Sequence, residues 1–225
     1  MSQTALTLKP NRIYTLFIIF ISFLSLNAQT HKSFYDGLFY LSNFIASPEF
    51  YELKKSKSDL EQVDIIFEKS KIYFEQDISE SLLCLTFCVL PFNKIDFKLP
   101  LGLGIMKIPL PSPPKNIFIK KLENLPSRLF LDSPKNPFGD KDKLAHFFGN
   151  AFLRYNISLF NFSKFMGIFV EETEQNFFAN GELDRRDLTA NYLGELFAEM
   201  LKNNSTSKPS QALIVYQLLY FRVNP

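Results

Sequence analysis

The sequence predicts a mainly α-helical protein with a helical, bundle-like C-terminal half and an extended, proline-rich middle segment that is partly β-stranded. Three observations lead to this fold class. Apolar residues recur at helical spacing in several segments, capping residues precede those segments, and prolines interrupt the stretch between them. At 46% hydrophobic residues, the 225-residue chain has an ordinary globular composition.

The N-terminus has the pattern of an export signal. Lys9 and Arg12 precede an uncharged apolar run at residues 14–26, and Ala28 offers a small residue for cleavage. The run is short for a membrane span, and an uncleaved anchor helix is the alternative. We expect residues 1–28 to be a signal peptide and the mature protein to be periplasmic, with peripheral attachment to the membrane left open.

The charge balance of the mature chain argues against nucleic acid as a partner. Cleavage after Ala28 would remove two of the 25 basic residues and none of the 23 acidic ones, which leaves a neutral chain. A neutral chain has no electrostatic basis for binding nucleic acid. The 26 phenylalanines and 9 tyrosines indicate either an apolar interior or a face that rests on a membrane or an envelope partner. The oligomeric state is not indicated.

Cys84 and Cys88 are the only thiols, and the sequence predicts that they stay unlinked. Four residues apart on a helix, their side chains do not reach disulfide geometry, and on a strand they would lie about 13 Å apart. We expect both to be small, buried hydrophobic residues.

The elements of the N-terminal half are predicted from apolar spacing and prolines. Residues 34–51 contain a short helix that ends before Pro48, and the Lys- and Ser-rich residues 52–58 are solvated. Asp59 then caps an amphipathic helix. The apolar side of that helix consists of Leu60, Val63, Ile66 or Phe67, Ser70 and Phe74. Residues 81–90 are a buried helix or a buried strand, because periodicity does not separate the two.

The middle of the chain is predicted to be extended. Residues 95–101, 104–110 and 116–122 alternate in part and are separated by prolines, which is typical of extended segments or edge strands. Residues 125–139 form another extended stretch with prolines. These segments complete an N-terminal helical and extended region, residues 29–138, of the mature chain.

Residues 139–225 are predicted to be a helical domain. Asp140 or Asp142 caps its first helix, Ser163 begins a second and Asp184 begins a third. The three helices span residues 143–155, about 163–178 and 184 to about 201. A polar loop at 203–209 and an apolar element of either type at 212–223 follow.

The polar faces of the three helices are expected to meet in one site, to which the second helix contributes one or two of Glu171, Glu172 and Glu174. His146 lies on one face of the first helix, and Asp187 and Asn191 share one face of the third. The small residues Gly194 and Ala198, further along the third helix, let a neighbouring helix approach closely. That approach would bury the asparagine and bring the aspartate toward the partner helix.

The candidate site combines one histidine, a carboxylate cluster and an Asp-x-x-x-Asn pair. Its proposed catalytic residues are His146, Glu171 and Asp187, and its proposed binding residues are Asp142, Lys143, Glu172, Glu174 and Asn191. Imidazole and carboxylates that converge in a low-dielectric cleft shift one another's pKa values and suit acid–base chemistry or metal ligation. One histidine with carboxylates favours magnesium, manganese or iron over zinc, but the pattern specifies no metal or cofactor.

Each member of the site also has a structural interpretation. The aspartates stand where helix N-termini favour acids, the glutamates are typical of a solvated helix face, and Asn191 can bond a neighbouring backbone. His146, beside two phenylalanines, is also typical of a core histidine with satisfied hydrogen bonds. The sequence has no serine or cysteine nucleophile motif, P-loop or dinucleotide fingerprint.

Residues 140–201 carry a pattern of polar residues and glycines. Its members are Asp142, Lys143, His146, Gly167, Gly181, Asp187, Asn191 and Gly194. The pattern resembles the YfiM-type family of predicted periplasmic lipoproteins of unknown function, and the wider VanZ-like pattern of small helical envelope proteins linked to glycopeptide resistance. The glutamate of these families falls on Glu171 by its spacing from Gly167, or on Glu172, which with Gln175 fits the VanZ-like spacing better.

The chain departs from these families in two respects. VanZ-like proteins are embedded in the membrane, whereas polar residues here interrupt every apolar run of the C-terminal half that would span it. The interrupting residues are Arg154, Asn156, Asn161 and Lys164. No cysteine directly follows the N-terminal apolar run, so the sequence lacks the lipid attachment site of the YfiM type.

These observations predict an exported cell-envelope protein. Its expected role is non-enzymatic, as a binding or structural module at the membrane surface that holds a lipid, a wall precursor or a protein partner through the helical core. The alternative is a metal-assisted hydrolase or transferase acting on an envelope lipid or cell-wall precursor, with His146 as base and the carboxylates as metal ligands. The residue pattern does not decide whether the chain is an enzyme.

Overall fold

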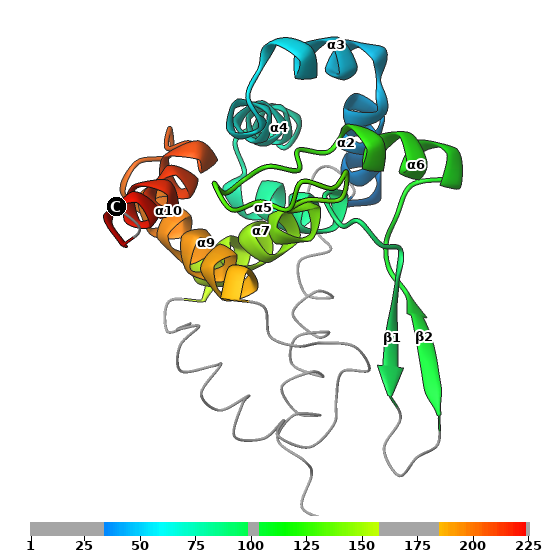
Figure 1. Cartoon of the computed structure of the whole chain (residues 1–225). Coiled ribbons are helices and arrows are strands. Elements are labelled where there is room, and N and C mark those ends of the chain that lie inside the picture. Colours follow the sequence, from blue (N-terminus) through cyan, green and yellow to red (C-terminus); the bar gives the residue numbers. More distant parts are fainter. Residues whose placement is uncertain (1–33, 99–103, 158–184, 224–225) are drawn as a thin grey trace, which may run out of the picture. The chain divides into compact units, whose positions relative to one another are not determined.

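The computed structural model describes residues 34–98, 104–157 and 185–223, which are mainly helical (Figure 1). The helices are α2 (Phe34–Ala46), α3 (Pro48–Ser56), α4 (Asp59–Tyr73), α5 (Ile78–Cys88), α6 (Lys115–Asn124), α7 (Lys141–Asn156), α9 (Arg185–Asn203) and α10 (Pro209–Val223). Strands β1 (Lys94–Lys98) and β2 (Ile105–Pro109) form the only sheet of the described residues. The predicted fold class, mainly α with a short β segment in the middle, is confirmed.

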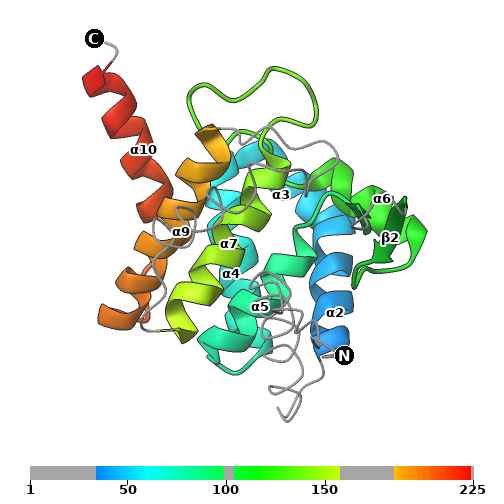
Figure 2. The ribbon, with the colours of Figure 1, turned by 90° about the horizontal axis from the view of Figure 1, so that it is seen from below.

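The core joins helices from both halves of the sequence. The described elements from α2 onward build one compact unit, Tyr35–Pro225. In that unit α7 packs against both α5 and α9 (Figure 2). Phe147 of α7 stacks on Phe197 of α9 at 5.4 Å between ring centroids, and Phe67 of α4 meets the same ring edge-on at 5.1 Å. All three rings are fully buried, so they form the centre of the core.

The apolar run at residues 81–90 is helical. Asp77 caps α5 by accepting a hydrogen bond from the amide of Glu80 at 3.0 Å. Most of this helix is buried, which explains why its sequence lacks an amphipathic pattern. Cys84 and Cys88 lie buried and unlinked on it, as predicted, and burial raises the pKa of both thiols.

The helices α7 and α9 approach each other closely, as the small residues of α9 predict. A Cβ atom on Gly194 would lie 2.2 Å from the carbonyl oxygen of Phe147, so glycine is required at this crossing. Ala198 and Leu201, further along the same face, are buried. The close approach sets the first turns of α7 and α9 side by side.

The start of α4 differs from the prediction. Its N-cap is Ser58, whose hydroxyl accepts from the amide of Glu61 while the Glu61 carboxylate accepts from the amide of Ser58. Asp59, predicted to be the cap, instead accepts hydrogen bonds from the amides of Ser127 and Arg128, at 2.7 and 2.6 Å. The reciprocal Ser58–Glu61 pair satisfies the helix end, which leaves Asp59 free to hold the loop after α6.

The helix α3 extends into the Lys- and Ser-rich residues 52–58, for which the sequence predicts only solvation. Ser47 caps this helix by accepting from the amide of Phe50, and Pro48 fills its first turn, where the missing amide proton has no helical partner. Lys55 and several neighbouring side chains are exposed, so α3 forms with a solvated outer face.

Of the three extended segments predicted in the middle of the chain, two form the β1–β2 hairpin. The prediction for the third, residues 116–122, is wrong, because this segment lies within α6. Helical spacing turns Lys121 and Asn124 toward the body. Their side chains donate to the carbonyl groups of Cys88 and Ile45, at 2.7 and 2.8 Å respectively. These buried hydrogen bonds to distant residues favour a helix over a strand.

The last apolar element, of either type by its sequence, is the helix α10. The polar loop predicted before it is present, and α10 begins at Pro209. Asp64 of α4 accepts hydrogen bonds from the amide and the hydroxyl of Ser210, at 2.8 and 2.6 Å. A carboxylate of α4 therefore holds the first turn of α10.

The signal predicted at 1–28 and the helix predicted at 163–178 lie outside the described residues and stay predictions. Within residues 34–98, 104–157 and 185–223, no helix combines the length and the apolarity needed to cross a membrane.

Candidate functional site

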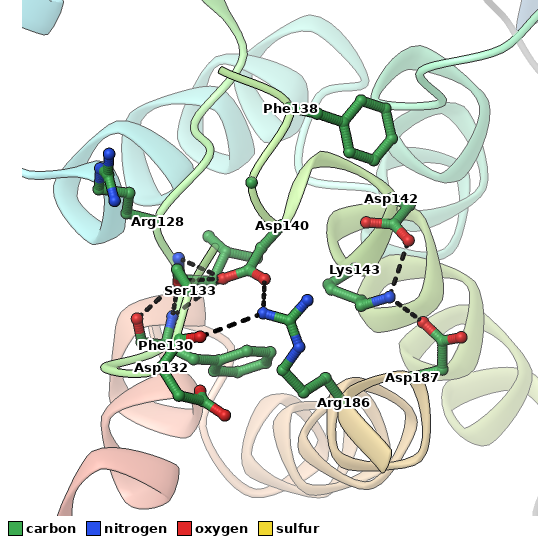
Figure 3. A network of polar contacts seen from close by, with 12 residues as sticks. Arg128, Phe130, Asp132, Ser133, Phe138, Asp140, Asp142, Lys143, Arg186 and Asp187 are labelled. Atoms are coloured by element: carbon green, nitrogen blue, oxygen red, sulfur yellow. Dashed lines mark hydrogen bonds and ion pairs between the residues drawn. The ribbon is translucent and has the colours of Figure 1, made fainter. Parts of the chain in front are cut away.

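The first turns of α7 and α9 bring together five of the predicted site residues, three of which Figure 3 shows. Asp142, Lys143 and His146 come from α7, and Asp187 and Asn191 come from α9. A spacing of three or four residues keeps each set on one helix face, and the close crossing sets the two faces against each other. The remaining three, Glu171, Glu172 and Glu174, lie outside the described residues, so their part in the site stays a prediction.

Lys143 lies at the centre of an ion-pair cluster. Its ammonium is 2.8 Å from Asp142 Oδ2 and 2.5 Å from Asp187 Oδ1, and its side chain is 5% exposed. Burial by itself lowers the pKa of Lys143, but the hydrogen bonds and charges of the two carboxylates outweigh burial and hold the pKa above its usual value. The ammonium therefore stays charged at neutral pH and occupies the space between the two carboxylates.

His146 lies at the edge of this cluster with both ring nitrogens near oxygen atoms. Its Nδ1 is 3.2 Å from Asn191 Oδ1, and its Nε2 is 3.5 Å from Asp187 Oδ1. Asn150 donates to the same Asn191 oxygen, at 2.5 Å, and to the carbonyl of His146, at 3.0 Å. Asn191 is buried and the His146 side chain is 42% exposed, so the imidazole connects a buried amide pair to the surface.

Asn150 is the member of this network that the candidate site omits. It follows His146 by four residues on α7, so helical spacing alone puts it on the same face. An asparagine without a chemical motif gives no signal of its own. Its role depends on Asn191, which the fold brings to it from 41 residues away.

Among the described residues, one carboxylate oxygen of the cluster has no hydrogen-bond donor. Asp142 Oδ1 is buried and receives no hydrogen bond from the described residues. Asp187 Oδ1 also lacks a well-directed hydrogen bond, but the Lys143 ammonium lies 2.5 Å away, and we treat this contact as an ion pair that compensates the charge. Asp142 Oδ1 is therefore the acceptor that the cluster leaves unsatisfied.

A second network beside this cluster is organised by Asp140 (Figure 3). Asp140 is fully buried, and its carboxylate accepts hydrogen bonds from the amides of Leu129 and Phe130 and from the hydroxyl of Ser133. Arg186 of α9 pairs with its other oxygen at 2.8 Å. Asp140 occupies the N-cap position of α7, as predicted, but its side chain makes no capping hydrogen bond, because the loop amides and the guanidinium engage it.

Arg186 connects this loop to the helices that carry the site. The loop, residues 125–139, has no helix or strand and contains turns and bends, where the sequence predicts an extended stretch. It is also held by α10, since Tyr216 donates to the Asp132 carboxylate at 3.2 Å. Gly139 has a positive φ of 54°, and a Cβ atom there would lie 2.0 Å from the carbonyl oxygen of Ser127. Arg186 is not among the predicted site residues, because its only sequence signal is its place next to Asp187.

The described part of the site does not form a metal centre. No group of three or more His, Cys, Asp or Glu side chains suited to a metal ion occurs among the described residues. The reason is local: the Lys143 ammonium takes the position between Asp142 and Asp187 that a cation would occupy. A metal ion would have to displace this ammonium or use residues outside the described ranges.

The arrangement suits recognition better than proton transfer. A general base needs a nitrogen that faces the substrate, and both nitrogens of His146 face cluster oxygens. No family model, curated protein or solved structure matches this chain. The resemblance of residues 140–201 to the YfiM-type and VanZ-like families therefore stays a prediction based on the residues that carry it.

Proposed function

We propose that this chain is an exported cell-envelope protein that binds an envelope component through the polar cluster between α7 and α9. The cluster comprises Asp142, Lys143, His146, Asp187 and Asn191. Its ligand carries hydroxyl or ammonium donors, as a lipid head group or a cell-wall precursor does. The protein acts at the membrane surface as a binding module.

The observation that carries the proposal is the unsatisfied oxygen of Asp142. A buried acceptor without a donor costs about 1–3 kcal/mol, and a ligand that supplies the donor removes this cost. Two carboxylates face one ammonium in the cluster, which favours donors and cations over anionic groups as ligands. The partly exposed His146 provides a second polar contact at the surface.

Binding of small probes tests this proposal. We expect ethanolamine, or soluble disaccharide-peptide fragments of the wall, to shift the amide resonances of residues 141–150 and 186–195 in NMR titrations. Asp142→Asn should weaken this binding by about tenfold or more, because the amide nitrogen replaces an acceptor with a donor. Asp36→Asn, on the exposed side of α2, is the matched control and should bind as the wild type does.

Two results would contradict the proposal. In the first, neither probe shifts these resonances at millimolar concentration. In the second, Asp142→Asn binds the probes as tightly as Asp36→Asn does.

A metal-assisted hydrolase or transferase is the second candidate. Its support is the exposed edge of His146, whose Nε2 lies beside Asp187. A manganese titration separates the two functions, because the enzyme requires stoichiometric binding that His146→Gln and Asp187→Asn both abolish. Binding of that kind, with hydrolysis of a wall precursor, would replace the binding module with the enzyme.

A further inference from the structure

The β1–β2 hairpin has one apolar face that is largely open to solvent. In its register Ile95 lies opposite Ile108, and Asp96 lies opposite Lys107. Because side chains alternate along a strand, Ile95, Met106 and Ile108 share one face, whereas Asp96 and Lys107 share the other. Ile95 and Met106 are 40% and 44% exposed. The hairpin is therefore amphipathic without a covered apolar face.

An exposed apolar face of this kind indicates a binding partner other than the described helices. An antiparallel sheet normally packs one face on a core, and an isolated two-stranded hairpin is marginally stable in water. Here the hairpin leaves the helical body beside α6 instead of lying on it (Figure 1). The exposed aliphatic side chains thus indicate a docking element rather than a part of the core.

The helix α6 carries side chains of the same kind. Ile119 is 45% exposed, and Lys115 and Lys120 are exposed on the same helix. Lys121 is buried and serves a structural role, because it donates to carbonyl groups at the end of α5. We name the exposed aliphatic residues and lysines of the hairpin and α6 the hairpin surface; they are Lys94, Ile95, Ile105, Met106, Lys107, Lys115, Ile119 and Lys120. Two exposed acidic residues, Asp96 and Glu123, lie on the same elements. By the register of the hairpin, Ile105 lies on the face of its lysines, opposite Ile95 and Met106.

Positive charge is concentrated in this part of the sequence. Between Glu80 and Glu123 the chain has six lysines and a single acidic residue, Asp96, although the whole chain has 25 basic and 23 acidic residues. The same stretch contains no arginine. The overall neutrality of the mature chain therefore conceals a local basic region at the hairpin surface.

We propose that the hairpin surface docks this protein on an anionic lipid bilayer. The aliphatic side chains of one hairpin face enter the interface between head groups and acyl chains. The long lysine side chains, which lie on the opposite hairpin face and on α6, reach the anionic head groups around the inserted hairpin. This proposal rests on the envelope location proposed above and names the membrane contact that the binding module uses. It is independent of the polar cluster between α7 and α9.

The composition of the surface distinguishes a bilayer from other partners. Sites for nucleic acid combine stacking aromatic rings with arginine, whereas the exposed side chains here are aliphatic residues and lysines. A stable dimer buries about 800 Å² on each partner, which a hairpin of two five-residue strands with a few half-exposed side chains does not provide. A bilayer accepts a small apolar area when basic residues surround it.

Sedimentation with lipid vesicles tests the docking surface. The protein is purified in the form that the envelope fraction yields. It is mixed with phosphatidylcholine vesicles that contain either no anionic lipid or 30 mol% phosphatidylglycerol, roughly the anionic content that charge-driven binding needs. We expect binding to the anionic vesicles only. Lys94→Gln/Lys107→Gln should reduce partition by about 20-fold, since each lysine near an anionic surface contributes about fivefold. Ile95→Ser/Met106→Ser should reduce it by a similar factor.

Matched variants on other faces give the controls. Lys55→Gln/Lys57→Gln removes the same charge from the exposed α3 segment, and Ile72→Ser/Leu218→Ser removes two aliphatic residues that are 64% and 65% exposed. Both control variants should partition as the wild type does. Thermal melts of all four variants should agree with the wild type, because none of the substituted side chains belongs to the core.

Several outcomes would overturn the docking surface. In the first, the wild-type protein binds neither kind of vesicle. In the second, it binds both kinds equally. In the third, the control variants lose as much partition onto the anionic vesicles as the hairpin variants do. Tight binding of a single-stranded oligonucleotide that the hairpin lysines control would assign the surface to nucleic acid instead. If the hairpin variants bind vesicles normally while Asp142→Asn still loses the small probes, the docking surface fails and the proposed function stands.

Discussion

At the scale of single residues, aspartates predicted to cap helices make contacts across the fold instead. Asp59 holds the amides of the loop after α6, and Asp140 holds the same loop nearer to α7. A carboxylate offers several acceptor sites, so amides from another segment compete with those of its own helix. For Asp140, whose loop amides are buried, the cost of leaving those amides without partners explains why the tertiary contacts win.

The network of His146 and Asn191 predicts coupled effects on stability. His146→Ala and Asn191→Ala should each lower the free energy of unfolding by about 1–3 kcal/mol, because Asn150 and the remaining partner lose an acceptor or a donor. The free energy of unfolding of the double variant should fall by less than the sum of the two single decreases, since both substitutions break the same contact. Urea unfolding of the three variants measures this coupling.

Lys55→Ala, on the exposed side of α3, is the control and should leave stability close to that of the wild type. Additive effects in the double variant would contradict the shared network and leave His146 as an independent surface residue.

Asp64 predicts a pH dependence of stability. Burial raises the pKa of Asp64, although its hydrogen bonds from Ser210 oppose the rise. The folded state therefore holds this proton more tightly than the unfolded state does. The stability that the protonated Asp64 contributes is fully present below pH 3.8, the pKa of this group in the unfolded chain. It is lost as the pH rises through the pKa of the folded state. Asp64→Asn should remove this part of the dependence of stability on pH.

Urea midpoints of the wild type and Asp64→Asn, measured between about pH 3 and pH 7, test the sign of this effect. The midpoint of the wild type relative to the variant should fall as the pH rises. A parallel course of the two profiles would show that the carboxyl group has the same pKa in both states.

At the scale of elements, the contact between α7 and α9 decides where the polar cluster forms. Gly194 lets the two backbones approach, and the crossing then aligns Lys143 and His146 with Asp187 and Asn191. The cluster therefore depends on a packing contact several residues away from its own side chains. A change in the crossing should disturb both stability and binding.

Substitution of two helical glycines tests this dependence. Gly194→Ala should lower the free energy of unfolding by about 2–3 kcal/mol or more, because its Cβ meets the Phe147 carbonyl oxygen at 2.2 Å. Gly149→Ala on α7 is the matched control. Its Cβ meets only Thr86 Cγ2, at 3.3 Å, and the higher helix propensity of alanine offsets that contact, so the change should stay within about 1 kcal/mol. Equal effects of the two substitutions would contradict the close crossing.

At the scale of the whole molecule, the described helices belong to one packed unit, Tyr35–Pro225. The sequence predicts separate regions at residues 29–138 and 139–225, and α5 of the first packs against α7 of the second. The predicted signal, residues 1–28, precedes this unit in the sequence. Export is a property that only the intact protein in its envelope can show.

The predicted signal gives a prediction for the intact protein. We expect the mature N-terminus to lie near Gln29, because the basic residues, the apolar run and Ala28 fit an exported precursor. N-terminal sequencing of protein from the native envelope fraction measures it. An intact Met1 would favour the uncleaved anchor, and protein confined to the cytosol would overturn both proposals about the envelope.

The sequence predicts those elements whose signals, such as apolar spacing and capping residues, lie within the element itself. The amphipathic pattern after Ser58 predicts α4, and the polar and small residues of α9 predict the face that meets α7. The same spacing places five members of the candidate site together. Whether Glu171, Glu172 and Glu174 join them stays a prediction.

The sequence by itself determined the mainly helical class and the site-bearing faces of α7 and α9, because periodicity and helix-start signals act within a few residues. The tertiary structure decided the features that depend on distant partners. Residues 116–122 are helical because Lys121 reaches a carbonyl group 33 residues earlier in the chain, and Asn150 joins the site through an asparagine 41 residues later. A buried polar group must find a partner, and only the fold determines which partner is near.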